Sequence, residues 1–212
     1  MADKNLYEVI DLGGVGDGQT DNAPAFARYI ARLQERGGGT IVVPDGVYGL
    51  SRPLILPPKI HLQMTPGAAL LALPQFQGDV VVQIGETGKN FDTGGWPNDQ
   101  YLLNGKIDGH QQPLVGLRLV GGLGVTVENL VVQNALKTGI EIGVERGHEM
   151  CLSKIRVVVD RGTQALPDSK GILFIQAHDS VVRDAVVTGY ATSVWNSASS
   201  NNFHIVHVWN YD

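Results

Sequence analysis

The sequence lacks the features that mark several large classes of protein. Its 212 residues include one cysteine, Cys151, so an internal disulfide is excluded. Cys151 lies in an apolar stretch, and we interpret it as a small core residue rather than a nucleophile. No apolar run approaches the roughly 20 residues of a membrane-spanning helix, so no membrane partner is expected. Basic residues are not in excess, and the net charge of −5 argues against a nucleic-acid partner.

Two further absences concern secretion and architecture. The first five residues do not begin a hydrophobic signal segment, so export by the Sec route is not expected. We expect an extracellular or virion-associated location that is reached by another route. A cytoplasmic location stays open. After Arg36 the chain has no strong helical period, which argues against a doubly wound α/β fold, because that fold needs crossover helices between its parallel strands.

What the sequence does have is glycine, at 27 positions, beside many valines and isoleucines. This combination favours short strands separated by tight turns. One helix is expected early in the chain, capped by Thr20 or Asp21 and ended by the glycines at 37–39. Its apolar face would consist of Ala23, Phe26, Ala27, Ile30 and Leu33. A strand at 40–43 and a turn at 44–46 follow.

These first residues carry a family resemblance. Residues 9–22 read VIDLGGVGDGQTDN and residues 37–48 read GGGTIVVPDGVY. The pattern resembles the amino-terminal signature of the pectate-lyase-like superfamily, whose members include polysaccharide lyases, hydrolases, alginate epimerases and phage tailspikes. The resemblance covers about residues 7–56 and implies a β-helix whose open end is capped by the helix. A phosphate-binding loop at 13–18 is not favoured, because the run lacks the P-loop lysine.

The remaining two thirds contain a repeat that is visible without the family. Five segments end in residues that tolerate left-handed backbone geometry, which are Gly109, Asn134, Asp160, Gly189 and Asn210. Two positions earlier stands a β-branched column of Ile107, Val132, Val158, Val187 and Val208. Side chains alternate along a strand, so we interpret this column as an inward stack with one residue per coil.

The expected fold class is therefore all-β, a right-handed parallel β-helix with an N-terminal capping α-helix. Residues 1–59 would form the signature and cap, and residues 60–212 the coils of one cooperative domain. A second strand follows each turn, as in Gly139-Ile140-Glu141-Ile142. Its middle residue should point outward, and the four such residues are Arg118, Glu141, Leu173 and Val194.

The Gly-Ile-Glu-Ile element also resembles the Asp-Gly-Ile-Asp element of family hydrolases, in which the aspartates act as acid or base. Thr138 stands at the first carboxylate position and Glu141 at the second, while the later paired aspartates and Gly-His-Gly element of those hydrolases are absent. Arg118 should lie one coil from Glu141 and favour its ionised form, which suits a base or a cation ligand. The alternative is a cross-strand ion pair on a solvated face.

Two reaction types stay open at this position. A hydrolase needs a second carboxylate, for which Asp168 is the candidate if its loop folds back. A lyase needs a Lys or Arg base, supplied by Lys170 or Arg118, beside a carboxylate-held Ca²⁺. No cofactor is otherwise expected.

Substrate contacts are expected from Lys137, Trp209 and Tyr190. For Trp209 and Tyr190 the reason is that aromatic faces suit the apolar faces of sugar rings. Trp195 is assigned to the core by its register. His204 and His207 share a strand without an evident third ligand, so no metal site is expected there.

A valine-rich outer face provides a second hypothesis. Outward positions on the first strand of each coil would be Val131, Val157, Val159 and Val186. An exposed apolar patch of this kind indicates a partner surface, and a homotrimer is the candidate, as in the tailspike branch of the family. The sequence thus leaves three functions open: a polysaccharide lyase or hydrolase, a non-catalytic glycan-binding spike or adhesin module, and the amino-terminal part of a longer catalytic protein.

Overall fold

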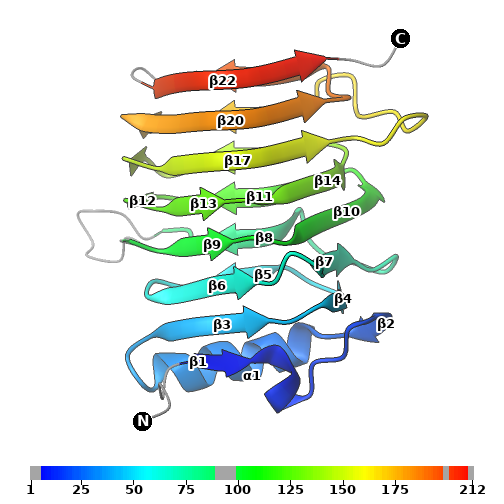
Figure 1. Cartoon of the computed structure of the whole chain (residues 1–212), viewed down its shortest axis with the longest axis vertical. Helices are drawn as coiled ribbons and strands as arrows, with labels where there is room; N and C mark the ends of the chain where they lie inside the picture. The colour runs from blue at the N-terminus through cyan, green and yellow to red at the C-terminus, as the bar shows by residue number, and fades with distance from the viewer. Residues whose placement is uncertain (1–5, 89–98, 198–200, 210–212) are drawn as a thin grey trace.

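The computed structural model describes residues 6–88, 99–197 and 201–209, with the backbone alone at positions 6, 7 and 209. The described chain is a stack of β-strand coils, with the helix α1 (Ala23–Gln34) at the amino-terminal end (Figure 1). The predicted fold class, a parallel β-helix with an N-terminal capping helix, is confirmed. Its strands lie in three parallel sheets.

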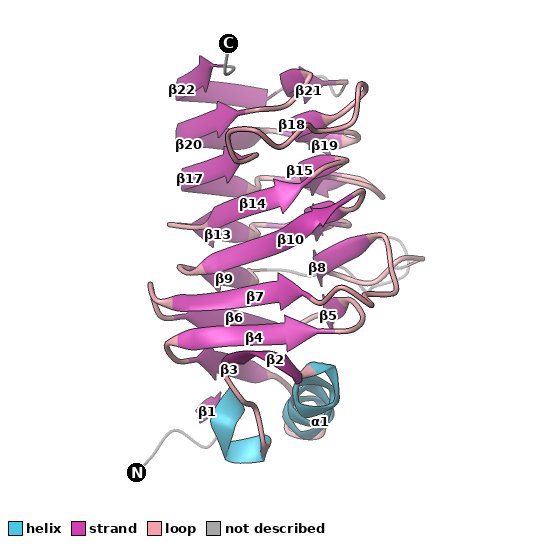
Figure 2. Cartoon of the chain, turned by 90° about the vertical axis from the view of Figure 1, so that its right-hand side faces the viewer, coloured by secondary structure: helices cyan, strands magenta, loops and turns pink. Residues whose placement is uncertain are grey.

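The largest sheet has 13 strands. They are β1 (Leu6–Glu8), β2 (Asp17–Asp21), β3 (Gly39–Val43), β4 (Gly46–Leu50), β6 (Ile60–Met64), β7 (Ala68–Ala72), β9 (Tyr101–Leu103), β10 (Lys106–Gln112), β13 (Thr126–Glu128), β14 (Val131–Ala135), β17 (Cys151–Val158), β20 (Ser180–Thr188) and β22 (Asn201–Trp209). Figure 2 shows successive strands lying one above another along the axis.

A six-stranded sheet forms the opposite wall. Its members are β5 (Leu54–Leu56), β8 (Val80–Ile84), β11 (Val115–Leu119), β15 (Thr138–Ile142), β18 (Lys170–Phe174) and β21 (Thr192–Asn196). Three two-residue strands complete the coils, β12 (Gly122–Leu123), β16 (Gly147–His148) and β19 (Ala177–His178). Strands β3, β4 and β5 pair directly with β6, β7 and β8, so the sheets run without interruption through residue 59.

The amino-terminal end is closed by α1 and the short 3₁₀ helix η1 (Val9–Leu12). Asn22 is the N-cap residue, and the Asp21 carboxylate accepts a hydrogen bond from the Ala23 amide at 3.0 Å. The helix buries Phe26, Tyr29 and Leu33 in the core, whereas the predicted Ala27 is exposed. The apolar stripe is therefore shifted toward Tyr29, which covers the first coil and keeps water from it.

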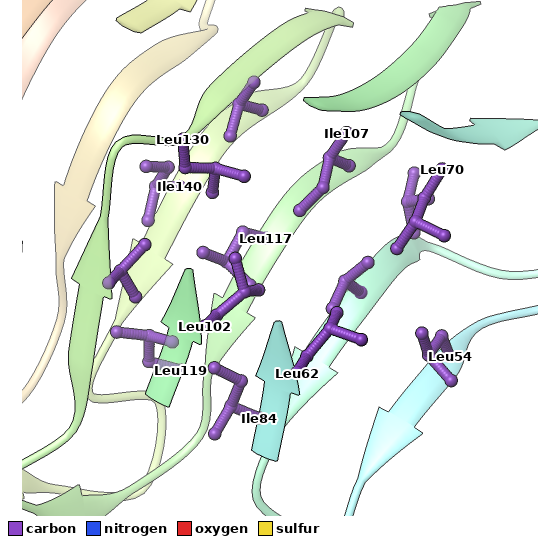
Figure 3. Close-up of a cluster of buried hydrophobic side chains, with 14 of the residues drawn as sticks. Leu54, Leu62, Leu70, Ile84, Leu102, Ile107, Leu117, Leu119, Leu130 and Ile140 are labelled. Atoms are coloured by element: carbon purple, nitrogen blue, oxygen red, sulfur yellow. The ribbon is translucent and has the colours of Figure 1, made fainter. Parts of the chain in front are cut away.

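The interior holds the predicted aliphatic stack, with two corrections. Val208 pairs with Val187 as expected but is 51% exposed, so it is not an interior residue. The other correction concerns Val158. Ile107 pairs with Val132, Val132 with Val157, and Val157 with Val187. Val157 is fully buried, while Val158 is half-buried on the outer side, so the assignment of Val158 to the stack is wrong by one residue. Leucines and isoleucines of the other strands fill the same interior (Figure 3).

Glycines let the two walls approach each other. A Cβ atom at Gly139 would lie 2.1 Å from Cγ1 of Val157 and 2.6 Å from the carbonyl oxygen of Gly171. Gly116 stands in the same way against Val132, and Gly171 against Val187. The glycine near the start of each of these three strands is therefore needed for close packing.

The left-handed corner of each coil lies elsewhere than predicted. Asn134 and Gly189 do have positive φ, of 55° and 83°, but Gly109 and Asp160 do not, and Asn210 lies outside the described residues. A regular column of positive φ occurs instead at the corner between the strands of the large sheet. Its members are Asn104 (63°), Asn129 (55°), Lys154 (54°), Asp184 (53°) and Ile205 (51°).

The one-residue shift also changes the predicted valine face. Val157 and Val159 are fully buried, so they cannot form a partner surface. Val131 and Val186 do face outward, but Arg156 lies between them on the same column. A shift of one residue moves every side chain of a strand to the other face, and this accounts for the error.

Candidate functional site

The outer face of the six-stranded sheet carries a column of side chains at matching positions on successive strands. Gln83, Arg118 and Glu141 occupy neighbouring coils in that order. Leu173 and then Trp195 continue the column. Trp195 is 51% exposed, so its assignment to the core is wrong, and Val194 takes the position facing the interior.

Arg118 binds two carboxylates on this face. Its Nε donates to Oε2 of Glu141 at 2.8 Å, and its Nη2 donates to Oδ2 of Asp79 at 2.8 Å. Nη1 donates to the other Asp79 oxygen at 3.4 Å. The side chains of Arg118 and Glu141 are 13% and 9% exposed, whereas that of Asp79 is 64% exposed. We call these three residues the Arg118 cluster.

Asp79 was missed by the sequence reasoning because it precedes β8 in a loop without a repeat. Its position is fixed by its main chain, since its carbonyl oxygen accepts a hydrogen bond from the Val115 amide at 2.8 Å. This bond places the Asp79 carboxylate beside the strand that carries Arg118. The signal in the sequence that could have identified Asp79 is its position as a charged residue immediately before a strand of this sheet.

Burial and ion pairing act in opposite directions on Arg118. Burial disfavours the charged guanidinium, but hydrogen bonds to Asp79 and Glu141 outweigh it, so the pKa of Arg118 lies above its usual value. The hydrogen bond from Arg118 holds the pKa of Asp79 below its usual range, and the charge of Lys137 adds to this effect. Asp79 is therefore an anion at neutral pH and cannot serve as a general acid.

The 161–167 loop and the residues after it bring Lys170 to the same sheet. Leu166 donates its amide to the carbonyl of Leu136 at 3.0 Å, so the loop folds back onto the preceding coil. Lys170 is half-buried, its Nζ donates to the carbonyl oxygen of Asp168, and it lies 5.9 Å from the centre of the Trp195 ring. The Asp168 side chain is exposed. Lys170 bonds to the backbone oxygen of Asp168 and not to its carboxylate.

A hollow of about 590 Å³ lies under this loop, beside the amino ends of β18 and β21. It is lined by the 161–167 loop and by Gly189, Tyr190 and Ala191. Lys137, a predicted substrate contact, is exposed on the preceding coil, and its carbonyl accepts the Lys170 amide at 3.1 Å. The backbones of Lys137 and Lys170 are therefore neighbours on adjacent coils. The side chain of Trp209 lies outside the described residues.

Tyr190 does not present its ring to solvent. The residue is 2% exposed, and its hydroxyl donates to the carbonyl oxygen of Ala135 at 3.1 Å. A ring in this position cannot stack on a bound sugar, so the predicted substrate contact is contradicted. Its role is to fill the interior behind the hollow and to satisfy a buried carbonyl.

Tyr190→Phe should therefore lower stability by about 1 kcal/mol and leave saccharide affinity unchanged. Burial raises the pKa of Tyr190 above its ordinary value of about 10. The neutral phenol is favoured in the folded state, so this contribution is fully present below pH ~10 and is lost as the pH rises further. Urea unfolding of both chains across alkaline pH measures this. Equal slopes of stability against pH for the two chains would contradict the assignment.

Among the described residues, no group of three or more His, Cys, Asp or Glu side chains lies close enough to hold a metal ion. A Ca²⁺ ion serving a lyase reaction at the Arg118 cluster would compete with Arg118 for the oxygens of Asp79 and Glu141. No helix in the described part of the chain is long and apolar enough to cross a bilayer.

Comparisons with known proteins agree with this architecture. The family model described as rhamnogalacturonase A/epimerase, pectate lyase-like, matches residues 6–208. A Parabacteroides merdae protein assigned as a glycosyl hydrolase superposes with a TM-score of 0.74 at 18% identity, over 96% of this chain and 98% of its own. A surface adhesin of Streptococcus pneumoniae superposes with a TM-score of 0.68 at 18% identity, over 97% of this chain and 56% of its own.

A sequence match of shorter extent adds one curated relative. Alginate lyase 7 of Azotobacter vinelandii is 42% identical over 45 residues, which make up 21% of this chain and 5% of that lyase. At these identities and lengths, the structural matches establish the fold, and the short match does not transfer an activity.

Proposed function

Because this chain belongs to the rhamnogalacturonase A/epimerase, pectate lyase-like family, we propose that it acts on an extracellular polysaccharide as a polysaccharide lyase or a glycoside hydrolase. The reaction would take place on the outer face of the six-stranded sheet, where Glu141, Arg118 and Lys170 lie on successive coils. Virion-associated display of the chain is compatible with the same substrate.

The observation that carries the proposal is the contact between Glu141 and Arg118. Glu141 stands on the strand that resembles the catalytic element of family hydrolases, and its Oε2 accepts a hydrogen bond from Arg118 Nε at 2.8 Å, which fixes the direction of the carboxylate. An ionised carboxylate can remove a proton or attack a sugar carbon. Lys170 is half-buried on the next coil, where it pairs with Thr138, and it would bind an acidic or hydroxyl group of the substrate or act as the base of a lyase.

A non-catalytic glycan-binding module, as in a trimeric spike or an adhesin, is the second candidate. It is favoured by the saturation of Arg118, whose three described donors all point to carboxylates. With Glu141 only 9% exposed, the Arg118 cluster would then be a structural ion pair. Light scattering on the purified chain measures the oligomeric state, and a monomer at all concentrations would count against a homotrimer.

One experiment separates these functions. The chain is incubated with galacturonan, alginate and carrageenan, and new reducing ends, new unsaturated uronate absorbance and heat of binding are all recorded. Reducing ends with unsaturation indicate a lyase, and reducing ends alone indicate a hydrolase. Heat of binding without cleavage supports the glycan-binding module. A chain that neither binds nor cleaves any of these polysaccharides would contradict both candidates.

A further inference from the structure

A second hollow lies on a different sheet, over the outer face of β10, β14, β17 and β20, which Figure 2 shows stacked along the axis. Its volume is about 280 Å³. We call it the valine groove. Its lining consists of Lys106, Val131, Gln133, Arg156, Val158, Asp160, Val186 and Thr188.

Strand register orders these side chains into two columns. Lys106, Val131, Arg156 and Val186 follow one another on four successive rungs. Rungs of a sheet are about 4.8 Å apart, so the two cations stand roughly 10 Å apart with Val131 between them. Gln133, Val158 and Thr188 form the neighbouring column.

The two cations of the groove are available for a ligand. Within the described part of the chain, neither Lys106 nor Arg156 takes part in an ion pair. Arg156 is exposed and Lys106 half-buried. In a chain with a net charge of −5, two cations left without a carboxylate partner on one groove favour an anionic group.

The acidic residue of the groove is already engaged. Both carboxylate oxygens of Asp160 accept hydrogen bonds from Nε2 of Gln133, at 2.9 and 2.8 Å, and Asn134 Nδ2 donates to one of them at 2.9 Å. Asp108, outside the lining but two residues from Lys106, accepts the His110 amide at 2.9 Å. These hydrogen bonds occupy the carboxylate oxygens, and with two cations against the one carboxylate of Asp160 the lining carries a formal charge of +1.

Thr188 gives a second, independent indication of a ligand. The residue is 1% exposed and lines the groove, yet its Oγ1 has no hydrogen-bond partner within the described part of the chain. Buried hydroxyls in folded proteins are nearly always hydrogen-bonded, because an unpaired one costs free energy. A hydroxyl group of a ligand would supply the partner.

From these observations we propose that the valine groove binds one acidic saccharide unit. Its carboxylate or sulfate oxygens lie between Lys106 and Arg156, a ring hydroxyl bonds to Thr188 Oγ1, and the apolar face of the ring rests on Val158, which pairs with Gln133 and Thr188 in the neighbouring column. Valines beside convergent polar groups, as in this lining, are typical of ligand sites. The site is separate from the Arg118 cluster, which lies on another sheet.

Calorimetry on the full chain tests the proposal with three probes of matched length: an oligogalacturonate, a sulfated galactan oligosaccharide and an uncharged galactan oligosaccharide. The two acidic probes separate carboxylate from sulfate recognition. Lys106→Gln with Arg156→Gln should weaken binding of the preferred acidic probe at least about tenfold, and added salt should reduce the difference. Arg183→Gln, an exposed arginine of β20 outside the lining, is the matched control and should change affinity less than about twofold.

Thr188→Val provides a readout that a structural role would not give. Because Oγ1 makes no described bond in the free chain, this variant should keep its melting temperature or raise it while binding the acidic probe more weakly. Every variant is first checked for folding by circular dichroism.

All measurements are repeated in a Glu141→Gln background, which separates this proposal from the proposed function. Binding that survives Glu141→Gln and is lost in the groove variants supports the valine groove, whatever the cleavage assay shows. Binding lost in Glu141→Gln but kept in the groove variants would overturn it and place the saccharide at the Arg118 cluster. Equal affinity for the uncharged probe, or no binding of either acidic probe, would overturn it as well.

Discussion

Val157→Asp is expected to abolish folding, while the same change at the adjacent Val158 is tolerated. Val157 is fully buried in the aliphatic stack, with its Cγ1 against Gly139 of the opposite wall. A carboxylate there would be buried without a partner, and the loss should exceed about 4 kcal/mol. Val158 is half-buried at the valine groove, so its carboxylate would stay hydrated and cost less than about 1 kcal/mol.

The measurement is urea unfolding followed by circular dichroism, after checking for soluble expression. The two variants differ by one position and carry the same substitution, so composition and net charge are identical. If Val158→Asp unfolded the chain and Val157→Asp did not, the register of β17 would be the one that the sequence pattern predicted.

Glu141→Gln is expected to reduce polysaccharide cleavage by about 10²–10⁴-fold. The amide keeps the shape of the side chain but cannot accept a proton or attack a sugar carbon. It still presents an oxygen to Arg118 Nε, so the fold should persist. Initial rates are measured on the polysaccharide that the panel identifies, together with the melting temperature of the variant.

Glu128→Gln is the matched control for this prediction. Glu128 also binds a cation on the next coil, Lys154, at 2.9 Å, but the pair is exposed and lies on the large sheet. Its neutralisation should leave the cleavage rate unchanged. Full activity of Glu141→Gln would reject Glu141 as the catalytic group.

Much of the architecture was predictable because it depends on residue types that repeat. The capping helix, the parallel coils and the adjacency of Arg118 and Glu141 all follow from periodic aliphatic and glycine positions. The error at Val158 arose because Asp160 was aligned with Gly109 and Asn134 as a left-handed residue. In the structure Asp160 is not left-handed, and it bonds to the Asn134 side chain instead.

The parts of the site that the sequence did not predict come from loops and long-range hydrogen bonds. Asp79 reaches Arg118 because its carbonyl holds the Val115 amide, a contact between residues 36 positions apart in the chain. Tyr190 turns inward because a carbonyl at Ala135 needs a donor. The left-handed corner was hidden because Asn, Lys, Asp and Ile all occupy it, so residue type alone does not mark it.

The two ends of the described stack are covered to different extents, and this difference sets the order in which the coils unfold locally. At one end α1 covers the first coil, whereas β22 is paired with β20 alone, and Ile205 in it is 67% exposed with a positive φ. Amide deuteration should therefore be fastest in β22, slower in β20 and slowest in the coils beside α1. Local unfolding of this 212-residue chain would therefore begin at β22 and proceed coil by coil toward α1.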